Sequence, residues 1–181
     1  MLSGKFENSI IYKRSSVRSY TEEPLASDQV EHILHAGMAA PSANNVQPWF
    51  FVTIDEKDIL KAIAKGLPYG KMTASAQLAI LVCAKRDVAD EDPFYEQALG
   101  AAVENMLLAA AEGGVGSCWC GIHSNSSETD DREIMFRDLL NMPDGLIPFA
   151  LIVLGVPANK NARKRDRFDE ARIHRNAWPR Q

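Results

Sequence analysis

Ala40-Pro41-Ser42-Ala43-Asn44-Asn45-Val46-Gln47-Pro48 runs directly into Trp49-Phe50-Phe51-Val52-Thr53-Ile54, and this junction indicates the class of fold. Pro41 disfavours helical geometry in the residue before it, so the helix that begins near Ser27 must end ahead of a loop at 40–48. The aromatic and β-branched run at 49–54 then predicts a strand. Helix, amide-rich loop and strand in succession indicate a protein of mixed α and β structure.

The same alternation continues along the chain. Apolar residues spaced three and four positions apart predict five helices. Their expected starts are Asn8, the N-cap Ser27, the cap Asp55, the cap Asp92 with Pro93 in the first position, and the cap Thr129. The expected buried stripes include Gly37 and Met38 in the second helix, and Ile134 and Phe136 in the last.

Three further strands are expected. Leu78 to Cys83 and Phe149 to Leu154 are continuous apolar runs, which predicts strands covered on both faces and therefore central in a sheet. Cys118 to Ile122 is expected to be a strand that leads into a turn.

Composition excludes several classes of function. A chain of 181 residues with 46% hydrophobic and 24% charged residues is expected to form one globular domain over 1–181. A net charge of -4 argues against general nucleic-acid binding. No apolar run approaches the ~20 residues of a membrane span, and 1–13 lacks a signal-peptide core, so we expect no membrane association and a cytoplasmic location. Cys83, Cys118 and Cys120 fit a reducing compartment better than a disulfide framework.

Two polar segments are candidates for ligand binding. Arg14-Ser15-Ser16-Val17-Arg18 lies where the first helix breaks, and two guanidinium groups with hydroxyls between them suit a phosphate monoester. The amide-rich loop at 40–48 offers neutral hydrogen bonds to a polyhydroxylated or heteroaromatic ligand. Taken singly, the arginine segment is more simply explained as a solvated basic turn, and the amide-rich loop is equally explained as a plain connecting loop.

The C-terminal segment differs from the rest of the chain. From Ala158 to Gln181 it is polar and basic, with Phe168, Ile173 and Trp178 as isolated apolar residues. A segment of ~24 such residues cannot form its own core, so we expect it to dock on another surface, most naturally a partner subunit.

These segments together, in this order, resemble the nitroreductase family of flavoproteins over nearly the whole chain. The family's R-x-S-x-R opening is matched by Arg14, Ser16 and Arg18, and its P-S-x-x-N-x-Q-P-W loop by Pro41, Ser42, Asn45, Gln47, Pro48 and Trp49. The P-Y-x-K-M segment of compact members is matched by Pro68, Tyr69, Lys71 and Met72. The tail pattern R-x-D-E-x-R-V-H is matched by Arg167, Asp169, Glu170, Arg172 and His174, with Ile173 in place of valine.

The resemblance implies an α+β fold with a mixed, mainly antiparallel sheet of four or five strands flanked by helices. It also implies a homodimer that exchanges the tail at 158–181 and binds FMN at the subunit interface. The implied FMN-binding residues are Arg14, Ser15, Ser16, Arg165 and Arg167 at the phosphate and ribityl end, Arg18 at the N1 and O2 side of the ring, Lys71 near the ring, and Pro41, Ser42, Ala43, Asn45 and Gln47 from the other subunit. Cys120 and Gly121 would present backbone amides to flavin N5, where glycine permits close approach.

The implied activity is hydride transfer from NAD(P)H to an electron-poor acceptor such as a nitroaromatic or a quinone, in ping-pong fashion. No G-x-G-x-x-G motif follows a strand, so the nicotinamide is expected to be a visiting substrate. No side chain stands out as a catalytic acid or base. Specialised flavin chemistry, such as dehydrogenation, dehalogenation or flavin breakdown, and a non-catalytic FMN carrier or sensor remain as alternatives.

Two other chemistries are disfavoured by the residue pattern. Cys118 and Cys120 with His123 lack the second pair of ligands that a structural zinc site needs, so no metal is expected. Ser42 is not surrounded by the G-x-S-x-G elbow of a hydrolase nucleophile.

Overall fold

The structure, a computed structural model, describes residues 8–123, 128–159 and 167–178. Its sheet has four strands in the order β1-β2-β4-β3, and each neighbouring pair is antiparallel. The strands are β1 (Trp49–Ile54), β2 (Leu78–Lys85), β3 (Gly116–Gly121) and β4 (Leu146–Gly155). The expected α+β fold is confirmed. The apolar runs are central as predicted, because β2 and β4 lie between the other two strands.

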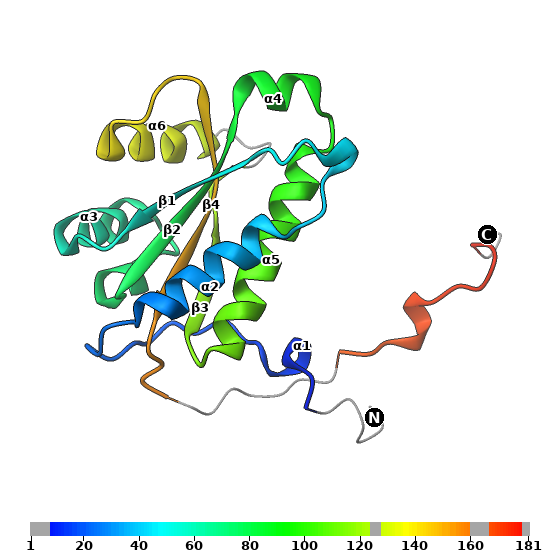
Figure 1. Ribbon diagram of the computed structural model, residues 1–181, viewed down its shortest axis with the longest axis horizontal. Helices are drawn as coiled ribbons and strands as arrows, with labels where there is room; N and C mark the ends of the chain where they lie inside the picture. The colour runs from blue at the N-terminus through cyan, green and yellow to red at the C-terminus, as the bar shows by residue number, and fades with distance from the viewer. Residues whose placement is uncertain (1–7, 124–127, 160–166, 179–181) are drawn as a thin grey trace.

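Helices cover both faces of this sheet (Figure 1). They are α1 (Ile10–Lys13), α2 (Ser27–Met38), α3 (Lys57–Gly66), α4 (Arg86–Glu91), α5 (Tyr95–Glu112) and α6 (Glu128–Leu140), with 3-10 turns η1 (Ala43–Asn45), η2 (Lys71–Ser75) and η3 (Glu170–Arg172). On one face, α2 and α5 pack over residues such as Ile80 and Val82. On the other, α3 and α6 pack over Leu81 and Leu151. None of the described helices combines the length and apolar character needed to span a membrane.

Several expected helix starts are wrong. The N-cap of α2 is Ala26 rather than Ser27, and the Gln29 side chain accepts the Ala26 N–H at 3.0 Å. The cap of α3 is Glu56 rather than Asp55, and Thr129 lies inside α6. The Asp92 carboxylate accepts the Phe94 N–H at 2.9 Å, which closes a local turn and delays the start of α5 to Tyr95.

Two residues expected inside the core lie outside it. Met38 and Ile134 are each 54% exposed, whereas Gly37 and Phe136 are buried as expected. Met38 is the last residue of α2, and the chain leaves the helix there. The short helix α4 was not expected, because its sequence carries no apolar stripe of helical spacing.

Residues 14–20, which we call the N-terminal strap, are fastened to the sheet. Ser16 forms a parallel bridge with Ser117 of β3, and the Val17 N–H donates to the Ser117 carbonyl at 2.8 Å. The Tyr20 hydroxyl lies 2.7 Å from the Val17 carbonyl and 3.2 Å from that of Val153 in β4. Burial raises the pKa of Tyr20, so its hydroxyl stays protonated and remains a donor. The strap therefore has a fixed position beside β3.

The described part of the tail extends away from the sheet and its helices (Figure 1). Its apolar residues Phe168, Ile173 and Trp178 are between 60% and 74% exposed. Exchange of this tail between subunits stays a prediction.

Candidate functional site

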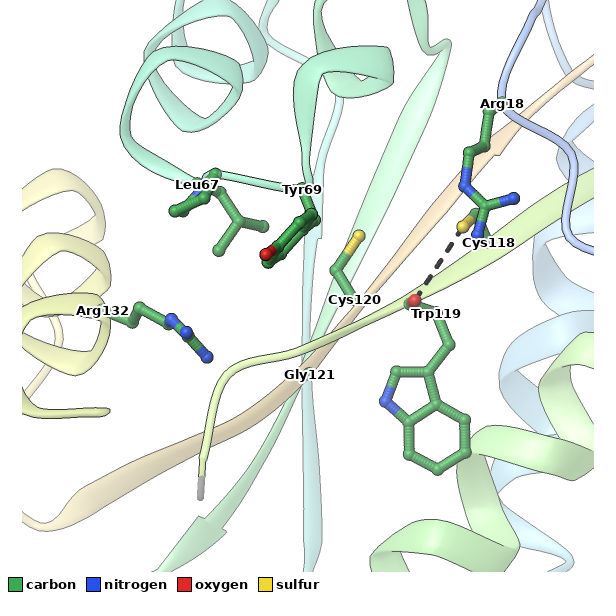
Figure 2. Close-up of a pocket in the computed structure, with 9 residues that line it drawn as sticks. Arg18, Leu67, Tyr69, Cys118, Trp119, Cys120, Gly121 and Arg132 are labelled. Atoms are coloured by element: carbon green, nitrogen blue, oxygen red, sulfur yellow. Dashed lines mark hydrogen bonds between the residues drawn. The ribbon is translucent and has the colours of Figure 1, made fainter. Parts of the chain in front are cut away.

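A pocket of about 410 Å³ lies at the β3 edge of the sheet (Figure 2). Its wall is formed by Arg18 of the strap, by Leu67, Pro68 and Tyr69 between α3 and η2, by Cys118 to Gly121 of β3, and by Arg132 of α6. Three of the residues predicted to bind flavin, Arg18, Cys120 and Gly121, are thus brought together. Their convergence depends on the strap, which holds Arg18 against the strand that carries the other two.

The backbone at Gly121 is open to a ligand. A Cβ built on Gly121 would meet no heavy atom within 4 Å. On the same strand, a Cβ on Gly116 would lie 2.9 Å from Cγ1 of Val17. Gly116 is therefore needed for close packing of the strap, whereas no atom of the described residues fills the space beside Gly121. A planar ligand ring would fit this space.

The side chains of β3 alternate across the sheet. Cys118 and Cys120 are buried and face the pocket, while Trp119 points to the opposite side (Figure 2). The Trp119 ring packs against Phe149 at a centroid distance of 6.4 Å. The pocket floor is therefore made of two thiols and the strand backbone.

The two thiols of the pocket perturb each other. A hydrogen bond with Cys120, helped by the Arg18 guanidinium, lowers the pKa of Cys118 to about 7. The same bond, together with burial and the Cys118 charge, raises the pKa of Cys120. The pair therefore holds one proton firmly and loses the other near neutral pH.

The phosphate-binding residues predicted in the strap lie next to this floor. Arg14 is the C-cap of α1, and its Nε lies 3.4 Å from Oε1 of Glu104 in α5. No motif in the sequence indicated this ion pair. Ser15 follows Arg14 at the break of α1, and the hydroxyl of Ser16 helps to lower the Cys118 pKa. Arg14 and Arg18 thus lie within the strap, on either side of the bridge between Ser16 and Ser117.

The predicted partner-side loop lies at the connection between α2 and β1, and the pocket of the same chain is lined by none of its residues. Asn44, Asn45 and Gln47 have φ values of 49°, 57° and 52°. This left-handed backbone is costly for a residue such as glutamine and persists only where other contacts enforce it. The Ser42 hydroxyl accepts the Gln47 N–H at 3.0 Å, and the Gln47 amide donates to Asn45 Oδ1 at 3.2 Å. Binding of the partner's flavin by Pro41, Ser42, Ala43, Asn45 and Gln47 stays a prediction.

Of the remaining residues predicted to bind flavin, those that the structure describes do not line the pocket. Lys71 is the first residue of η2, two positions after Tyr69, and is exposed. Arg167 is exposed in the described part of the tail, and Arg165 lies outside the described residues. Sequence reasoning did not select Arg132, which reaches the pocket only because α6 packs beside it. It also left out Cys118, although the period of two along a strand places it on the same face as Cys120.

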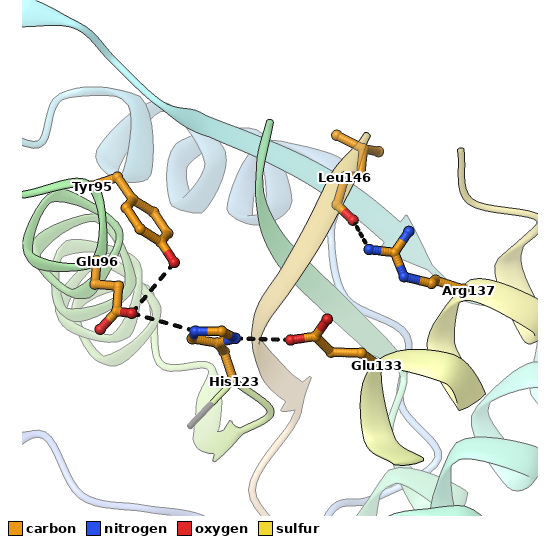
Figure 3. Close-up of polar contacts among 6 residues, drawn as sticks. All are labelled: Tyr95, Glu96, His123, Glu133, Arg137 and Leu146. Carbon is orange, nitrogen blue, oxygen red and sulfur yellow. Dashed lines mark hydrogen bonds and ion pairs between the residues drawn. The ribbon is translucent and has the colours of Figure 1, made fainter. Parts of the chain in front are cut away.

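Sequence reasoning also missed a charged cluster beside the pocket (Figure 3). His123, just after β3, has Nδ1 2.8 Å from Oε1 of Glu133 in α6 and Nε2 3.4 Å from Oε1 of Glu96 in α5. The Tyr95 hydroxyl donates to Glu96 at 3.3 Å. Both ring nitrogens of His123 therefore face carboxylates, and the cluster ties the end of β3 to two helices.

Comparison with known proteins identifies the family. The model of the nitroreductase family matches residues 11–77 and 64–156. A protein of Archaeoglobus fulgidus, provisionally named NADH dehydrogenase/NAD(P)H nitroreductase, is 36% identical over 173 residues, which cover 93% of this chain and 97% of that one. A crystal structure from Bacteroides thetaiotaomicron with the same provisional name superimposes with a TM-score of 0.88 at 31% identity and covers 97% of this chain and all of that one. The chain belongs to the nitroreductase family, as its motifs predicted.

Two further relatives are informative about ligands. A provisionally named nitroreductase from Desulfovibrio desulfuricans, solved in complex with FMN, is 31% identical, with a TM-score of 0.76 and coverage of 94% of this chain and 96% of that one. A Bacillus subtilis protein named FMN reductase [NAD(P)H] is 27% identical over 177 residues, covering 90% of this chain and 70% of that one.

Proposed function

We propose that this protein is an FMN-dependent oxidoreductase that takes hydride from NAD(P)H and reduces an electron-poor organic acceptor such as a nitroaromatic or a quinone. The observation that carries the proposal is the pocket in which Arg18 stands beside the open backbone of Gly121. An FMN complex and an FMN reductase among the relatives support it.

The pocket, the strap beside it and the tail carry the residues that would bind FMN. Arg14, Ser15 and Ser16 would hold the phosphate and ribityl end, together with Arg165 and Arg167. Arg18 would place a positive charge at the N1 and O2 side of the ring, where it stabilises negative charge. The backbone of Cys120 and Gly121 would lie against the ring, because no side chain at 121 blocks it. When bound, FMN supplies the two-electron chemistry.

The chain's own contribution is then binding and electrostatics. The strap keeps the Arg18 guanidinium in place through its bonds to β3. Tyr69, which is 85% exposed at the rim, is available to contact a ring that enters the pocket. No acid or base is assigned, and solvent suffices as the source of protons.

The proposal includes a cytoplasmic homodimer in which the loop at 41–47 and the tail at 158–181 serve the partner. The exposed Phe168, Ile173 and Trp178 support a docked tail, because burial of each would stabilise the assembly by roughly 1.5–3 kcal/mol. Cys83, Cys118 and Cys120 are all unpaired, which suits a reducing compartment. Deletion of residues 160–181 is expected to abolish both the dimer and flavin retention. A truncated protein that stays dimeric and yellow would refute the role of the tail.

The decisive experiment is the absorption spectrum of the purified protein, followed by identification of the flavin released on heating. Non-covalent FMN together with NAD(P)H oxidation coupled to quinone reduction is the expected result. FAD, or no flavin after reconstitution, would contradict the cofactor assignment. Bound FMN without NAD(P)H oxidation would instead identify a carrier or sensor.

A further inference from the structure

The pair of thiols on the pocket floor has no role in the proposed hydride transfer. Cys118 and Cys120 stand two positions apart on β3, so their side chains project from the same face of the strand. They are 2% and 6% exposed, and both line the pocket. Both sulfur atoms therefore face the same cavity from one strand. Two adjacent thiols that open onto a cavity form a potential chelate.

The surroundings of the pair restrict which cation it would accept. Among the described residues, no group of three or more His, Cys, Asp and Glu side chains is arranged to hold a metal ion. A tetrahedral zinc site, which needs four ligands, is therefore not formed by these residues. Soft thiolate ligands select soft cations such as Cu(I). Cu(I) is satisfied by two thiolates, because a filled d shell favours linear two-coordination.

We propose that Cys118 and Cys120 form a two-coordinate site for Cu(I) on the floor of the pocket. Binding would replace two S–H protons with one Cu⁺, leaving a bis-thiolate complex of net charge -1 and releasing two protons to solvent. Metal oxidation state does not change, so the step needs no oxidant or reductant.

The charge of this complex matches its environment. Arg18 lines the same pocket as Cys118 (Figure 2), and its positive charge favours a thiolate there. A buried anion requires a nearby positive charge, which Arg18 supplies. Cu(I) bound here would sit beneath the backbone of Cys120, so it would also obstruct the proposed flavin pocket. Because bound FMN would occupy the same pocket, copper uptake is measured on protein from which flavin has been removed as well as on the protein as purified.

The third cysteine supplies a matched control. Cys83 lies on the central strand β2, is fully buried and does not line the pocket. The protein as purified and the same protein after removal of flavin would each be titrated anaerobically with Cu(I) in competition with bicinchoninate. One Cu(I) per chain is expected for the flavin-free protein. Cys118→Ser and Cys120→Ser should each lose this stoichiometric uptake, and Cys83→Ala should keep it, with circular dichroism used to verify the fold of each variant.

A second measurement tests the site without any substitution. X-ray absorption at the copper edge of the wild-type complex should show two sulfur neighbours and no nitrogen or oxygen ligand. Failure of the flavin-free wild-type protein to take up Cu(I) against the competitor would overturn the proposal. So would nitrogen or oxygen ligands in the absorption spectrum, or undiminished uptake by a folded Cys118→Ser or Cys120→Ser protein.

Discussion

The Nδ1 atom of His123 lies 2.8 Å from Oε1 of Glu133, and this contact joins the residue that follows β3 to helix α6. The Glu133 side chain is 14% exposed, whereas Glu96 on the other side of the ring is 53% exposed. We expect Glu133→Ala to lower the free energy of unfolding by roughly 1.5–3 kcal/mol, because it removes a shielded charged hydrogen bond. Glu96→Ala should cost less than ~1 kcal/mol, since solvent screens the exposed pair. Urea denaturation of both variants tests the difference, and equal losses would contradict it.

Gly121 provides a test that separates flavin binding from folding. Gly121→Val adds a side chain where an added Cβ meets nothing within 4 Å, so stability should change by less than ~0.5 kcal/mol. FMN affinity, measured by quenching of flavin fluorescence, should fall sharply because the side chain occupies the space proposed for the ring. The matched control is Gly116→Ala, whose Cβ would lie 3.1 Å from the Gly155 carbonyl oxygen and should cost roughly 1–3 kcal/mol of stability. Unchanged FMN affinity in Gly121→Val would place the flavin elsewhere.

The thiol pair predicts an unusual titration. A lowered pKa in an acid means that the charged form appears earlier as the pH rises, so ultraviolet thiolate absorbance should increase around pH 7, where Cys118 ionises. Cys118→Ser should remove this step. Cys120→Ala should shift it to higher pH, because the hydrogen bond from Cys120 is the largest cause of the lowered pKa. Cys83 should not contribute, since burial raises its pKa to about 12. A step near pH 7 that survives Cys118→Ser would refute the assignment.

The tail arginine tests the phosphate end of the proposed site. Arg167→Ala should weaken FMN binding by about one to two decades, the equivalent of one charge-assisted hydrogen bond. Riboflavin, which lacks the phosphate, should bind with the same affinity to the wild-type protein and to Arg167→Ala. Arg172→Ala is the control variant in the same segment, because Arg172 Nε already pairs with Asp169 Oδ2 at 3.0 Å. A loss of riboflavin affinity as large as that of FMN would show that Arg167 does not contact the phosphate.

Features set by local residue patterns were predictable. The uninterrupted apolar run of β2 marks a strand buried on both faces, and the loop at 40–48 is bounded by two prolines. Helix starts were less predictable, because more than one residue near each start could supply the capping oxygen. Asp92 illustrates this, since its carboxylate is used by Phe94 before the helix begins.

Contacts between distant segments were not predictable from periodicity. The approach of Arg132 to the pocket depends on how α6 packs, and the pairing of Arg14 with Glu104 depends on how α1 meets α5. The residues around His123 in the sequence do not indicate its two carboxylate partners, because these come from two separate helices. The family resemblance selected Arg18, Cys120 and Gly121, which the structure brings together in one pocket, but it gave no reason to expect a second thiol beside them. Contact of these residues with flavin stays a prediction.

The bridge between Ser16 and Ser117 has a consequence for biosynthesis. The strap is made first, yet the strand that receives it emerges from the ribosome only after most of the chain, and that strand pairs with β4, which is made later still. Closing a loop of this length is slow relative to forming local helices. In a nascent chain, Arg14 and Arg18 are therefore present long before the β3 strand to which the strap binds. We expect cofactor capture to occur only after β3 and β4 have been made and paired, so that a flavin-loaded protein is one whose sheet has already formed.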